Sequence, residues 1–536
     1  MNRLDSLGQV SGEILQGIRF FLGVPGFLRN PLTEAEARAV LLARLANRER
    51  VFLRLVRSAI YAFPDSAYAR LLAIAGCQYG DLEQLVWTDG VEGALSTLYL
   101  RGVYLTVDEF KGRRPAVRGS AILNVDPTQL RNPLTNRPIF VRTSASGGMG
   151  TPVPLDLASQ RDRAVNVWLA LAARGGLEWI HGVWAVPGST GAGKLLAYAA
   201  FGQPPARWFS QVDPTTQGLH PRYAWSGRLL RWGSFLAGSA LPAPEYVPVE
   251  DPRPVARWMR DVLQAGRVPH AYTFSSAAAR LAVTACDHGI DIRGAQLTIS
   301  GEPLTEARSA AIKRSGVQAV ANYGSAETGV VGEGCLAPAA PDDVHVYHDL
   351  HAVIQPGPTA DSVGIPPSAL LISTLHPTAP IVFLNFSPGD QAVREVRDCG
   401  CPMAALGWTT HLHTVRSFEK LTAGGMTLLD GDVIRVLEET LPATFGGGPT
   451  DYQLVEEEGQ NGDPRLRLLV HPAIGPLNEE AVVDAFLASI GQGSGAQRVM
   501  ELVWRNANFV QIERRPPIVS GGGKVLHLHH PSRHPL

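Results

Sequence analysis

The sequence has no excess of charge of either sign and no long hydrophobic run. It holds 48 Lys and Arg against 49 Asp and Glu, which gives a formal net charge of −1 at pH 7. Broad binding to nucleic acid or to an anionic membrane surface needs a basic surplus, so this balance argues against both. No stretch of about 18 uninterrupted apolar residues occurs, so no membrane span is predicted. The sequence also shows no internal repeat.

Cysteine is scarce, with five residues in a chain of 536. Because the set is odd and sparse, it does not suggest a disulfide framework, and it favours a reducing, cytoplasmic location. The opening residues, MNRLDSLGQVSGEILQG, lack the apolar core and the cleavage site of a secretory signal peptide. Their composition supports the same expectation.

The apolar residues are numerous enough to form more than one hydrophobic core. The hydrophobic fraction is 45% and the charged fraction 18%, both typical of a soluble globular protein. A chain of 536 residues is too long for a single core, so two or more domains are expected.

Strand and helix patterns alternate through the middle of the chain, which predicts α/β layering. Before that region, Thr33 and Glu36 have the spacing of a capping box ahead of a helical pattern that runs to Ala59. Ser159 is expected to cap a helix that ends near Ala173. Other expected helices are 67–103, 254–264 and 306–314, and the expected strands are 181–186, 296–300, 318–322 and 369–374.

A change of composition at about 413–425 separates a smaller C-terminal stretch. Within it, 451–456 and 466–470 have the pattern of strands and 478–487 has the pattern of a helix. The stretch is therefore expected to form a small α+β domain of its own.

A glycine-rich stretch at residues 143–154 reads TSASGGMGTPVP and follows an apolar run at 139–141. This context predicts a strand that opens into a loop. Glycine allows backbone N–H groups to approach an anion closely, and the hydroxyls of Thr143, Ser144 and Ser146 can add hydrogen bonds to phosphate oxygens.

Further along the chain lie ISGEPL at 299–304, NYGSAETG at 322–329, FSPGD at 386–390 and a lysine, Lys524, after three glycines. Together with the glycine-rich loop, and in this order, they resemble the adenylate-forming superfamily of acyl-CoA synthetases and adenylation domains. The likeness is greatest to the phenylacetate–CoA ligase branch. It extends over about residues 60 to 530.

The resemblance implies a large N-terminal domain with layered sheets and helices, followed by a small mobile α+β lid. Residues 1–130 would form the helical region of the large domain, 131–417 its core for ATP and acyl binding, and 418–536 the lid. Such an enzyme would use ATP and Mg²⁺ to convert a small carboxylic acid into an adenylate. It would then transfer the acyl group to a thiol, by default that of coenzyme A.

The resemblance also assigns roles to individual residues. Tyr323 would stack on adenine, Glu327 would bind Mg²⁺ and Asp390 would accept the ribose hydroxyls. Lys524 would sit between the attacking carboxylate and the α-phosphate, which repel each other, because a flexible ammonium on a mobile loop can bridge them and leave. The remaining residues that the resemblance assigns to the nucleotide site are Gly301, Glu302, Pro303, Gly324, Ser325 and Arg416.

Three regions depart from the family pattern: the phosphate loop, the motif that contains Ala326, and the hinge. The phosphate loop of the family resembles S-S-G-T-T-G-K-P, and here two hydroxyls and the lysine are missing, so backbone N–H groups would have to supply most of the phosphate contacts. Ala326 replaces a Thr or Ser, and Phe418 occupies the hinge position, with Glu419 or Lys420 as substitutes. The candidate phosphate-loop residues are Ser144, Ser146, Gly147, Gly148, Gly150 and Thr151.

Three cysteines and one histidine have a spacing that suits the ligands of a metal ion. Cys335 precedes His345 by ten residues, and Cys399 and Cys401 flank one glycine. Three Cys and one His suffice for a tetrahedral structural zinc site, and some phenylacetate–CoA ligases resemble this pattern. His348 and His351 are alternative ligands.

The stretch GSTGAGKL at 188–195 fits the phosphate-loop pattern G-x-x-x-x-G-K, but Leu195 occupies the place where Mg²⁺ binding needs Ser or Thr. In the resemblance this stretch corresponds to a glycine-rich segment beside the acyl pocket. Other candidates for that pocket are Trp184, Ser189, His270, Tyr272 and Phe274.

Three functions are compatible with these residues. The favoured one is an AMP-forming acid–thiol ligase with coenzyme A as acceptor. The second is a biosynthetic adenylating enzyme that passes the group to a carrier protein or an amine, or that activates another oxyanion such as nitrite. The third is a non-catalytic nucleotide-binding protein, which the losses in the phosphate loop favour and the retention of Lys524 opposes. The acid is not identified, and a homodimer is among the oligomeric states left open.

Overall fold

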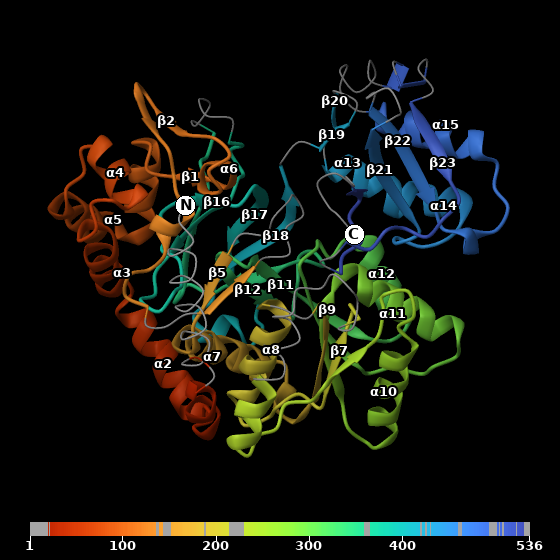
Figure 1. Cartoon of the computed structure of the whole chain (residues 1–536), viewed down its shortest axis with the longest axis horizontal. Coiled ribbons are helices and arrows are strands. Elements are labelled where there is room, and N and C mark those ends of the chain that lie inside the picture. The colour runs from red at the N-terminus through yellow and green to blue at the C-terminus, as the bar shows by residue number, and fades with distance from the viewer. Residues whose placement is uncertain are drawn as a thin grey trace, which may run out of the picture.

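The computed structural model has an α/β architecture, with a small α+β unit at the C-terminal end that stands apart from the larger body (Figure 1). The predicted fold class is confirmed. The structure describes residues 20, 22–135, 139–142, 152–186, 189–213, 230–358, 365–418, 421–423, 426–428, 430–458, 464–492, 501–502, 504–505, 509–520 and 523–529.

Helices form the N-terminal part of the larger body. The predicted capping box is present, because the N–H of Glu36 donates to the Thr33 hydroxyl and the N–H of Thr33 donates to the Glu36 carboxylate. The helices are α2 (Glu34–Ala46), α3 (Arg48–Val56), α4 (Ala67–Ile74), α5 (Tyr79–Leu100) and α6 (Val107–Phe110), and a turn of wider helix covers Arg57–Tyr61.

A four-stranded sheet packs against these helices. Its strands follow the order β1 (Leu105–Thr106), β16 (Phe386–Ser387), β15 (Leu371–Thr374) and β14 (His351–Ile354). Three buried rings join the two layers: Phe110 lies edge-on to Phe383 and Phe386, with ring centroids 5.5 and 5.4 Å away. Segments nearly 280 positions apart in the chain therefore share one core.

A ten-stranded sheet is the centre of the molecule. The strands from β11 to β8 are parallel, whereas those from β11 to β17 are antiparallel. Their order is β17 (Asp390–Val396), β18 (Thr410–Ser417), β13 (Val344–Val346), β12 (Gly329–Gly334), β11 (Gln318–Ser325), β10 (Gln296–Ser300), β9 (Pro269–Phe274), β6 (Ile180–Ala185), β7 (Arg207–Ser210) and β8 (Pro244–Tyr246).

Helices cover both faces of the parallel part, as expected for a buried parallel sheet. On one face His181 stacks on Tyr198 of α8 (Ser189–Ala199), with ring centroids 4.6 Å apart, and α7 (Leu157–Ala173) packs beside α8. The next residue of β6, Gly182, points to the other face. There Trp258 of α10 (Arg253–Gln264) fills the space beside the glycine, and α11 (Ser275–Asp287) and α12 (Glu306–Arg314) continue that layer.

One predicted cap is wrong. Asp156, and not Ser159, is the N-cap residue of α7, and Ser159 is buried within the first turn. Both residue types are good caps, and the helix begins three residues earlier than the hydrophobic pattern indicates.

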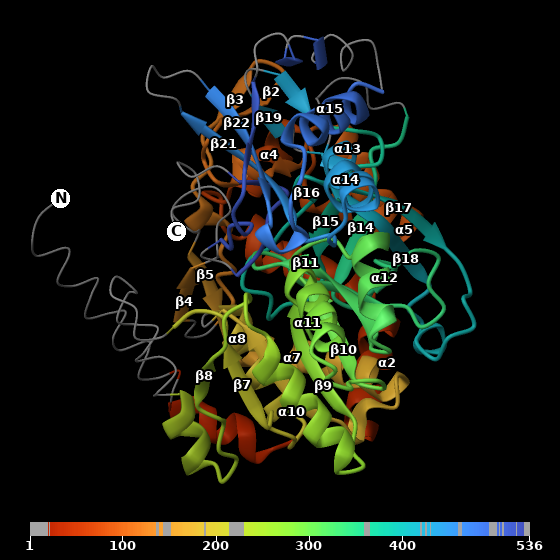
Figure 2. The ribbon, with the colours of Figure 1, turned by 90° about the vertical axis from the view of Figure 1, so that its right-hand side faces the viewer.

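The C-terminal unit, residues 430–529, has a core of its own. Buried side chains from its helices and its sheet meet there, among them Val433, Leu454, Leu468, Phe486 and Trp504. Its elements are α13 (Asp430–Arg435), α14 (Leu441–Phe445), α15 (Glu479–Ile490) and a sheet in the order β23 (Val510–Glu513), β22 (Pro464–Val470), β21 (Tyr452–Glu458) and β24 (Leu528–His529). In Figure 2 the unit lies over α12 of the larger body.

Short elements complete the described chain. They are the two-stranded pairs β2 (Ala116–Arg118) with β3 (Ala121–Leu123), β4 (Ile139–Arg142) with β5 (Pro152–Leu155), and β19 (Leu421–Ala423) with β20 (Met426–Leu428), and the single turns Pro127–Leu130, Gly176–Glu178, Ala404–Leu406 and Pro472–Ile474. Among the helices described, none has both the length and the apolar character needed to cross a membrane.

The contact between β6 and α10 gives a first prediction. A Cβ on Gly182 would lie 2.8 Å from the ring of Trp258, so Gly182→Ala should force the two elements apart and lower the free energy of unfolding by about 1–3 kcal/mol. Urea unfolding followed by fluorescence measures this loss. In the control Gly80→Ala, in the first turn of α5, no heavy atom stands within 4 Å of the new Cβ, so the midpoint should stay or rise. Equal midpoints for both variants would contradict the packing.

Candidate active site and metal centre

The predicted nucleotide residues lie at the carboxyl ends of β10 and β11, the edge where open α/β sheets bind ligands. At Gly301 the backbone has φ +79°, and a Cβ there would lie 2.9 Å from Phe274 and 3.0 Å from Cε of Lys524. At Gly324 a side chain would meet the Gly329 carbonyl of the neighbouring strand. The two glycines thus allow close approaches. The residues that these two segments bring to this edge are Gly301, Glu302, Pro303, Tyr323, Gly324, Ser325 and Glu327.

Lys524 reaches this edge from the C-terminal unit. A tight turn carries it, since the N–H of Ser520 donates to the Lys524 carbonyl at 2.8 Å and the N–H of Lys524 donates to the Ser520 hydroxyl at 3.2 Å. The N–H of Val525 donates to the Ser276 hydroxyl of α11, at 3.4 Å. The turn also seals against the strand ends, because a Cβ on Gly523 would clash with Gln211 and Val186.

The amine of Lys524 lies among carboxylates. Its nitrogen is 5.6 Å from the ring centroid of Phe274. Burial lowers the pKa of the Lys524 amine, and the negative charges of Glu302, Glu327 and Asp390 act in the opposite direction. Four predicted site residues, separated by more than 220 positions in the chain, therefore come together.

Asp390 and Tyr323 meet directly. The phenol of Tyr323 donates a hydrogen bond of 2.9 Å to the Asp390 carboxylate, and this contact, together with burial, raises the pKa of Tyr323. Arg416 lies next to this pair, opposite Gln391 in the β17–β18 register. Its guanidinium donates to Asp342 at 2.8 Å, so its orientation is set from the side away from the sheet edge.

Glu327 is held in a compact turn. The hydroxyls of Ser325 and Thr328 each accept the other residue's backbone N–H, at 3.1 and 3.2 Å. The carboxylate of Glu327 has a loose ion pair, 3.9 Å long, with Lys111 at the end of α6. Such a weakly engaged carboxylate is suited to bind a divalent cation. Ala326, where the family has a hydroxyl, packs against the apolar core instead.

Glu302 has a structural role that its motif does not reveal. Its carboxylate accepts the N–H of Ser276 in the first turn of α11, at 2.8 Å, and lies 3.6 Å from Arg308 of α12. Arg308 is almost fully buried and forms a 2.7 Å ion pair with Glu438 of the C-terminal unit. Glu438 also accepts from Thr305 and lies 2.6 Å from His527. This cluster, from Glu302 to His527, joins the two parts of the molecule.

The predicted phosphate loop lies outside the described residues, as do Glu419 and Lys420. The residues of the loop are Ser144, Ser146, Gly147, Gly148, Gly150 and Thr151. The N–H of Phe418, at the predicted hinge, donates to the Gly389 carbonyl at 2.9 Å, directly beside Asp390.

The stretch that fits the phosphate-loop pattern is helical. Ser189 already belongs to α8, and Lys194 lies in the second turn of that helix, so the described part of the stretch is no anion-binding loop. Trp184 is also placed differently from the prediction. It lies on the α10 face of β6, where its indole N–H donates to the Val247 carbonyl, whereas His270, Tyr272 and Phe274 line the α8 face. A strand reverses its side-chain direction at every residue, so Trp184 does not share a pocket with those three.

Thiols and imidazoles converge at the antiparallel side of the sheet. One ligand atom each from Cys335, His345, Cys399 and His411 lies within 4.8 Å of the others. The thiol of Cys401 lies beside them, 3.2 Å from Nε2 of His345. The four predicted zinc ligands are thus brought together. His348 and His351 are engaged elsewhere, with the N–H of Thr410 and the carbonyl of Val330.

His411 is a candidate ligand that the sequence did not indicate. It lies beside the predicted ligands because His345 and His411 are paired residues in the neighbouring strands β13 and β18. Its Nδ1 lies 2.9 Å from the Asp343 carboxylate, and its buried Nε2 has no hydrogen-bond partner among the described residues. The alternating pattern of residues 410–417 could have indicated a strand that contains His411. The strand with which it would pair cannot be predicted from a single sequence.

His345 is oriented in the same manner. Its Nδ1 lies 2.5 Å from the Trp408 carbonyl, to which it donates, so the lone pair of Nε2 points at the thiols. Burial lowers the pKa of His345 to about 4, against the opposing effect of that hydrogen bond, so the ring is neutral. A histidine that binds a metal ion usually donates its other ring N–H to a fixed acceptor, and both His345 and His411 have such an acceptor.

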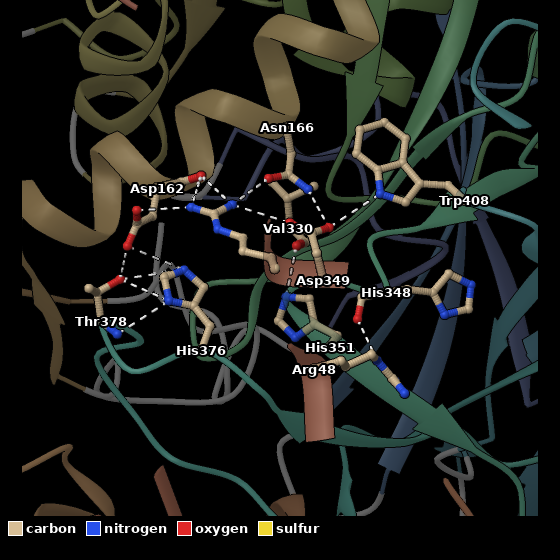
Figure 3. Close-up of polar contacts among 11 residues, drawn as sticks. Arg48, Asp162, Asn166, Val330, His348, Asp349, His351, His376, Thr378 and Trp408 are labelled. Carbon is tan, nitrogen blue, oxygen red and sulfur yellow. Dashed lines mark hydrogen bonds and ion pairs between the residues drawn. The ribbon is translucent and has the colours of Figure 1, made fainter. Parts of the chain in front are cut away.

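A buried polar network fixes the loop that carries Trp408 (Figure 3). The indole N–H of Trp408 donates to Asp349 at 3.2 Å, and Asn166 of α7 donates to the same carboxylate at 2.8 Å. Arg44 of α2 completes the network with ion pairs to Asp349 and Asp162, at 3.2 and 2.9 Å. The candidate metal site is thus tied to the N-terminal helices.

The chain matches no protein-family model and no curated protein sequence. Similar solved structures include 2-hydroxyisobutyryl-CoA ligase in complex with its acyl adenylate, at 15% identity and a TM-score of 0.49, covering 93% of this chain and 90% of that one. Another is the O-succinylbenzoate coenzyme A synthetase of Bacillus subtilis with ATP and magnesium, at 11% identity and a TM-score of 0.40, covering 72% and 68%. These scores lie below 0.5, so the side chains of this chain have to carry any functional conclusion.

The ion cluster between the two parts of the molecule gives a pH prediction. Burial alone would raise the pKa of Glu438, but Arg308, His527 and Thr305 outweigh it and lower the pKa to about 2. The carboxylate therefore stabilises the folded state fully above its ordinary pKa of 4.5, and this contribution disappears as the pH falls toward 2. Glu438→Gln should lower the free energy of unfolding at pH 7 by about 3 kcal/mol, because it removes the closer of the two carboxylates beside Arg308 and leaves Glu302 at 3.6 Å.

Chemical denaturation of wild type and Glu438→Gln from pH 7 to pH 3 measures this contribution. The difference between the two proteins should be largest above pH 4.5 and should shrink below it. Glu439→Gln is the matched control, because Glu439 is the exposed neighbour and should behave as wild type throughout. A difference that stays the same at pH 3 would contradict the ion-pair origin.

Proposed function

We propose that this chain is an ATP- and Mg²⁺-dependent ligase that converts a carboxylic acid into an acyl adenylate and passes the acyl group to a thiol, by default that of coenzyme A. The observation that carries the proposal is the position of Lys524. The C-terminal unit delivers this amine to the carboxyl ends of the parallel strands, next to Glu302, Glu327 and Asp390.

This arrangement suits the charge changes of the reaction. An oxygen of the acid carboxylate attacks the α-phosphorus of ATP, the bond from phosphorus to the bridging oxygen breaks, and pyrophosphate leaves. Both reactants are anionic, so an ammonium between them lowers the barrier. Lys524 would provide that charge, Glu327 would hold Mg²⁺, and Asp390, aligned by Tyr323, would accept the ribose hydroxyls.

Transfer to a thiol requires Lys524 to withdraw, because the thiol must reach the carbonyl carbon before AMP can leave. Among the described residues, the contacts that hold the C-terminal unit include several polar ones as well as apolar packing of Val519 against the core of the larger body. Besides the cluster around Arg308, they include the hydrogen bond from Arg280 to the Thr450 carbonyl, at 3.3 Å. An interface of this kind is compatible with rotation of residues 418–536 as a lid.

Two other assignments compete with this one. In the first, a biosynthetic enzyme transfers the group to a carrier protein or an amine, or activates nitrite in place of a carboxylate. In the second, the chain binds nucleotide without catalysis. The similar solved structures carry CoA-ligase names, which makes coenzyme A the first acceptor to test.

ATP–pyrophosphate exchange across a panel of aryl, fatty and amino acids, with nitrite included, tests the adenylation step. Wild type should exchange with one substrate class, and Lys524→Ala should lower the rate by at least about 100-fold while ATP binding is retained. Lys313→Ala, at an exposed position of α12, is the control. A wild-type protein that binds ATP and exchanges with no member of the panel would favour the non-catalytic assignment.

We further propose that the thiol cluster holds one structural zinc ion. Cys335, Cys399 and Cys401 would supply thiolates, and His345 or His411 the nitrogen, which gives the donor set typical of closed tetrahedral sites. The three cysteines are free, and Cys335 lies far along the chain from Cys399 and Cys401, so a shared ion would fasten the end of β12 to the segment between β17 and β18. Zinc would supply cross-linking here and no catalytic chemistry.

Elemental analysis of the purified protein should find about one zinc ion per chain. Cys399→Ser should lower both the zinc content and the melting temperature, because the ion contributes to folding only when its ligands are intact. Cys286→Ser, which changes an exposed thiol at the end of α11, should alter neither. Zinc-free protein, or unchanged zinc content and stability in Cys399→Ser, would refute the site.

A further inference from the structure

A polar layer lies beneath Lys524 on the α8 face of the sheet. Tyr272 precedes Phe274 by two residues on β9, so its ring points to the same face one step further from the strand ends. Across the neighbouring strands, Ser300, Asn322 and Glu333 are register partners, and Ser300 is hydrogen-bonded to the Tyr272 phenol. The layer therefore continues from the site of Lys524 into the interior.

Lys194 of α8 covers this layer. Its amine lies 4.5 Å from the ring centroid of Tyr272, and only 8% of the residue is exposed. Within the described ranges this amine has neither an ion pair nor a hydrogen bond. Burial lowers the pKa of the Lys194 amine, Glu333 raises it, and the neighbouring cation Arg163 lowers it further. A buried ammonium without a partner is costly, which indicates that a ligand completes it.

Two arginines, Arg163 of α7 and Arg174 directly after that helix, add to the positive charge. The guanidinium of Arg163 lies so close to Gly329 that no side chain would fit there, and in the described part of the chain it has no carboxylate partner. Arg174 donates only to neutral groups, the Thr298 hydroxyl and the Leu297 carbonyl. Among the described residues of this layer, one buried carboxylate, Glu333, opposes these cations. It already accepts a hydrogen bond of 2.5 Å from the Asn322 side-chain amide.

We propose that the acid activated at Lys524 carries a second anionic group at its far end, a carboxylate or its equivalent, and that Lys194 binds that group with support from Arg163. This inference rests on the proposed adenylating function. Phe274 lies beside Lys524, and Tyr272 lies beside Lys194. The two rings are two residues apart on one strand, which corresponds to a distance of about 7 Å. A short dicarboxylate or a carboxy-substituted aryl acid has this spacing between its two acidic groups.

Paired acids that differ only at the far end test the proposal. The pairs are hexanoate with adipate and benzoate with terephthalate, and 4-aminobenzoate is added as a contrast with a neutral polar group at the far end. In ATP–pyrophosphate exchange, wild type should prefer the diacid of at least one pair by about tenfold or more, the value expected for one charge-assisted hydrogen bond. Lys194→Met should abolish the preference, Lys194→Arg should retain it, and the exposed-site control Lys313→Met should leave it unchanged.

Thermal denaturation provides a readout that does not depend on activity. Removing an uncompensated buried cation should leave the melting temperature of ligand-free Lys194→Met equal to or above that of wild type, whereas a purely structural lysine would make it fall. The preferred diacid should raise the melting temperature of wild type and not that of Lys194→Met. A variant with a lowered melting temperature, or one that still responds to the diacid, overturns the role of Lys194.

The remaining outcomes separate the two proposals. Exchange that favours monoacids or aminobenzoate, or an unchanged diacid preference in Lys194→Met, overturns the second-anion inference and leaves the adenylating function intact. Silence of the wild type with every acid, together with retained ATP binding, overturns the adenylating function and this inference with it.

Discussion

The arrangement of the whole molecule depends on one buried cation, Arg308. It lies on α12 of the larger body, yet its closest carboxylate, Glu438, belongs to the C-terminal unit. Glu302 of the larger body lies 3.6 Å away, so docking of the C-terminal unit adds a second and closer carboxylate to this buried guanidinium. Docking in turn places the turn of Ser520 and Lys524 on the strand ends. The position of the Lys524 amine is thus linked to an ion pair formed elsewhere.

The charges of the core are separated along the strands. Carboxylates of Glu302, Glu327 and Asp390 gather at the strand ends, and the cations of Lys194 and Arg174 lie deeper, beside Tyr272 and Thr298. Lys524 adds a positive charge at the strand ends. A molecule that spanned both levels with an acidic group at each end would meet a cation at each.

Much of this fold could be predicted from the sequence, because its elements have strong local signals. The helix 306–314 and the strand 296–300 match α12 and β10 residue for residue, and the capping box at Thr33 is present. The motif residues around Tyr323, Asp390 and Lys524 also come together. What local signals do not contain is which face a residue uses and which strands pair. The direction of the Trp184 side chain could therefore not be predicted, and the place of His411 became clear only when β18 was seen beside β13.

The turn that carries Lys524 does more than supply an amine. At Gly523 its backbone lies against Gln211 and Val186, the residues that follow β7 and β6, and a Cβ there would lie 3.2 Å from Phe274 of β9. The backbone at this one glycine thus covers the ends of three adjacent strands and the polar layer beneath them. Under the proposed function, the acid would therefore bind in this layer before the turn docks over it, and the docked turn would hold the acyl adenylate in place.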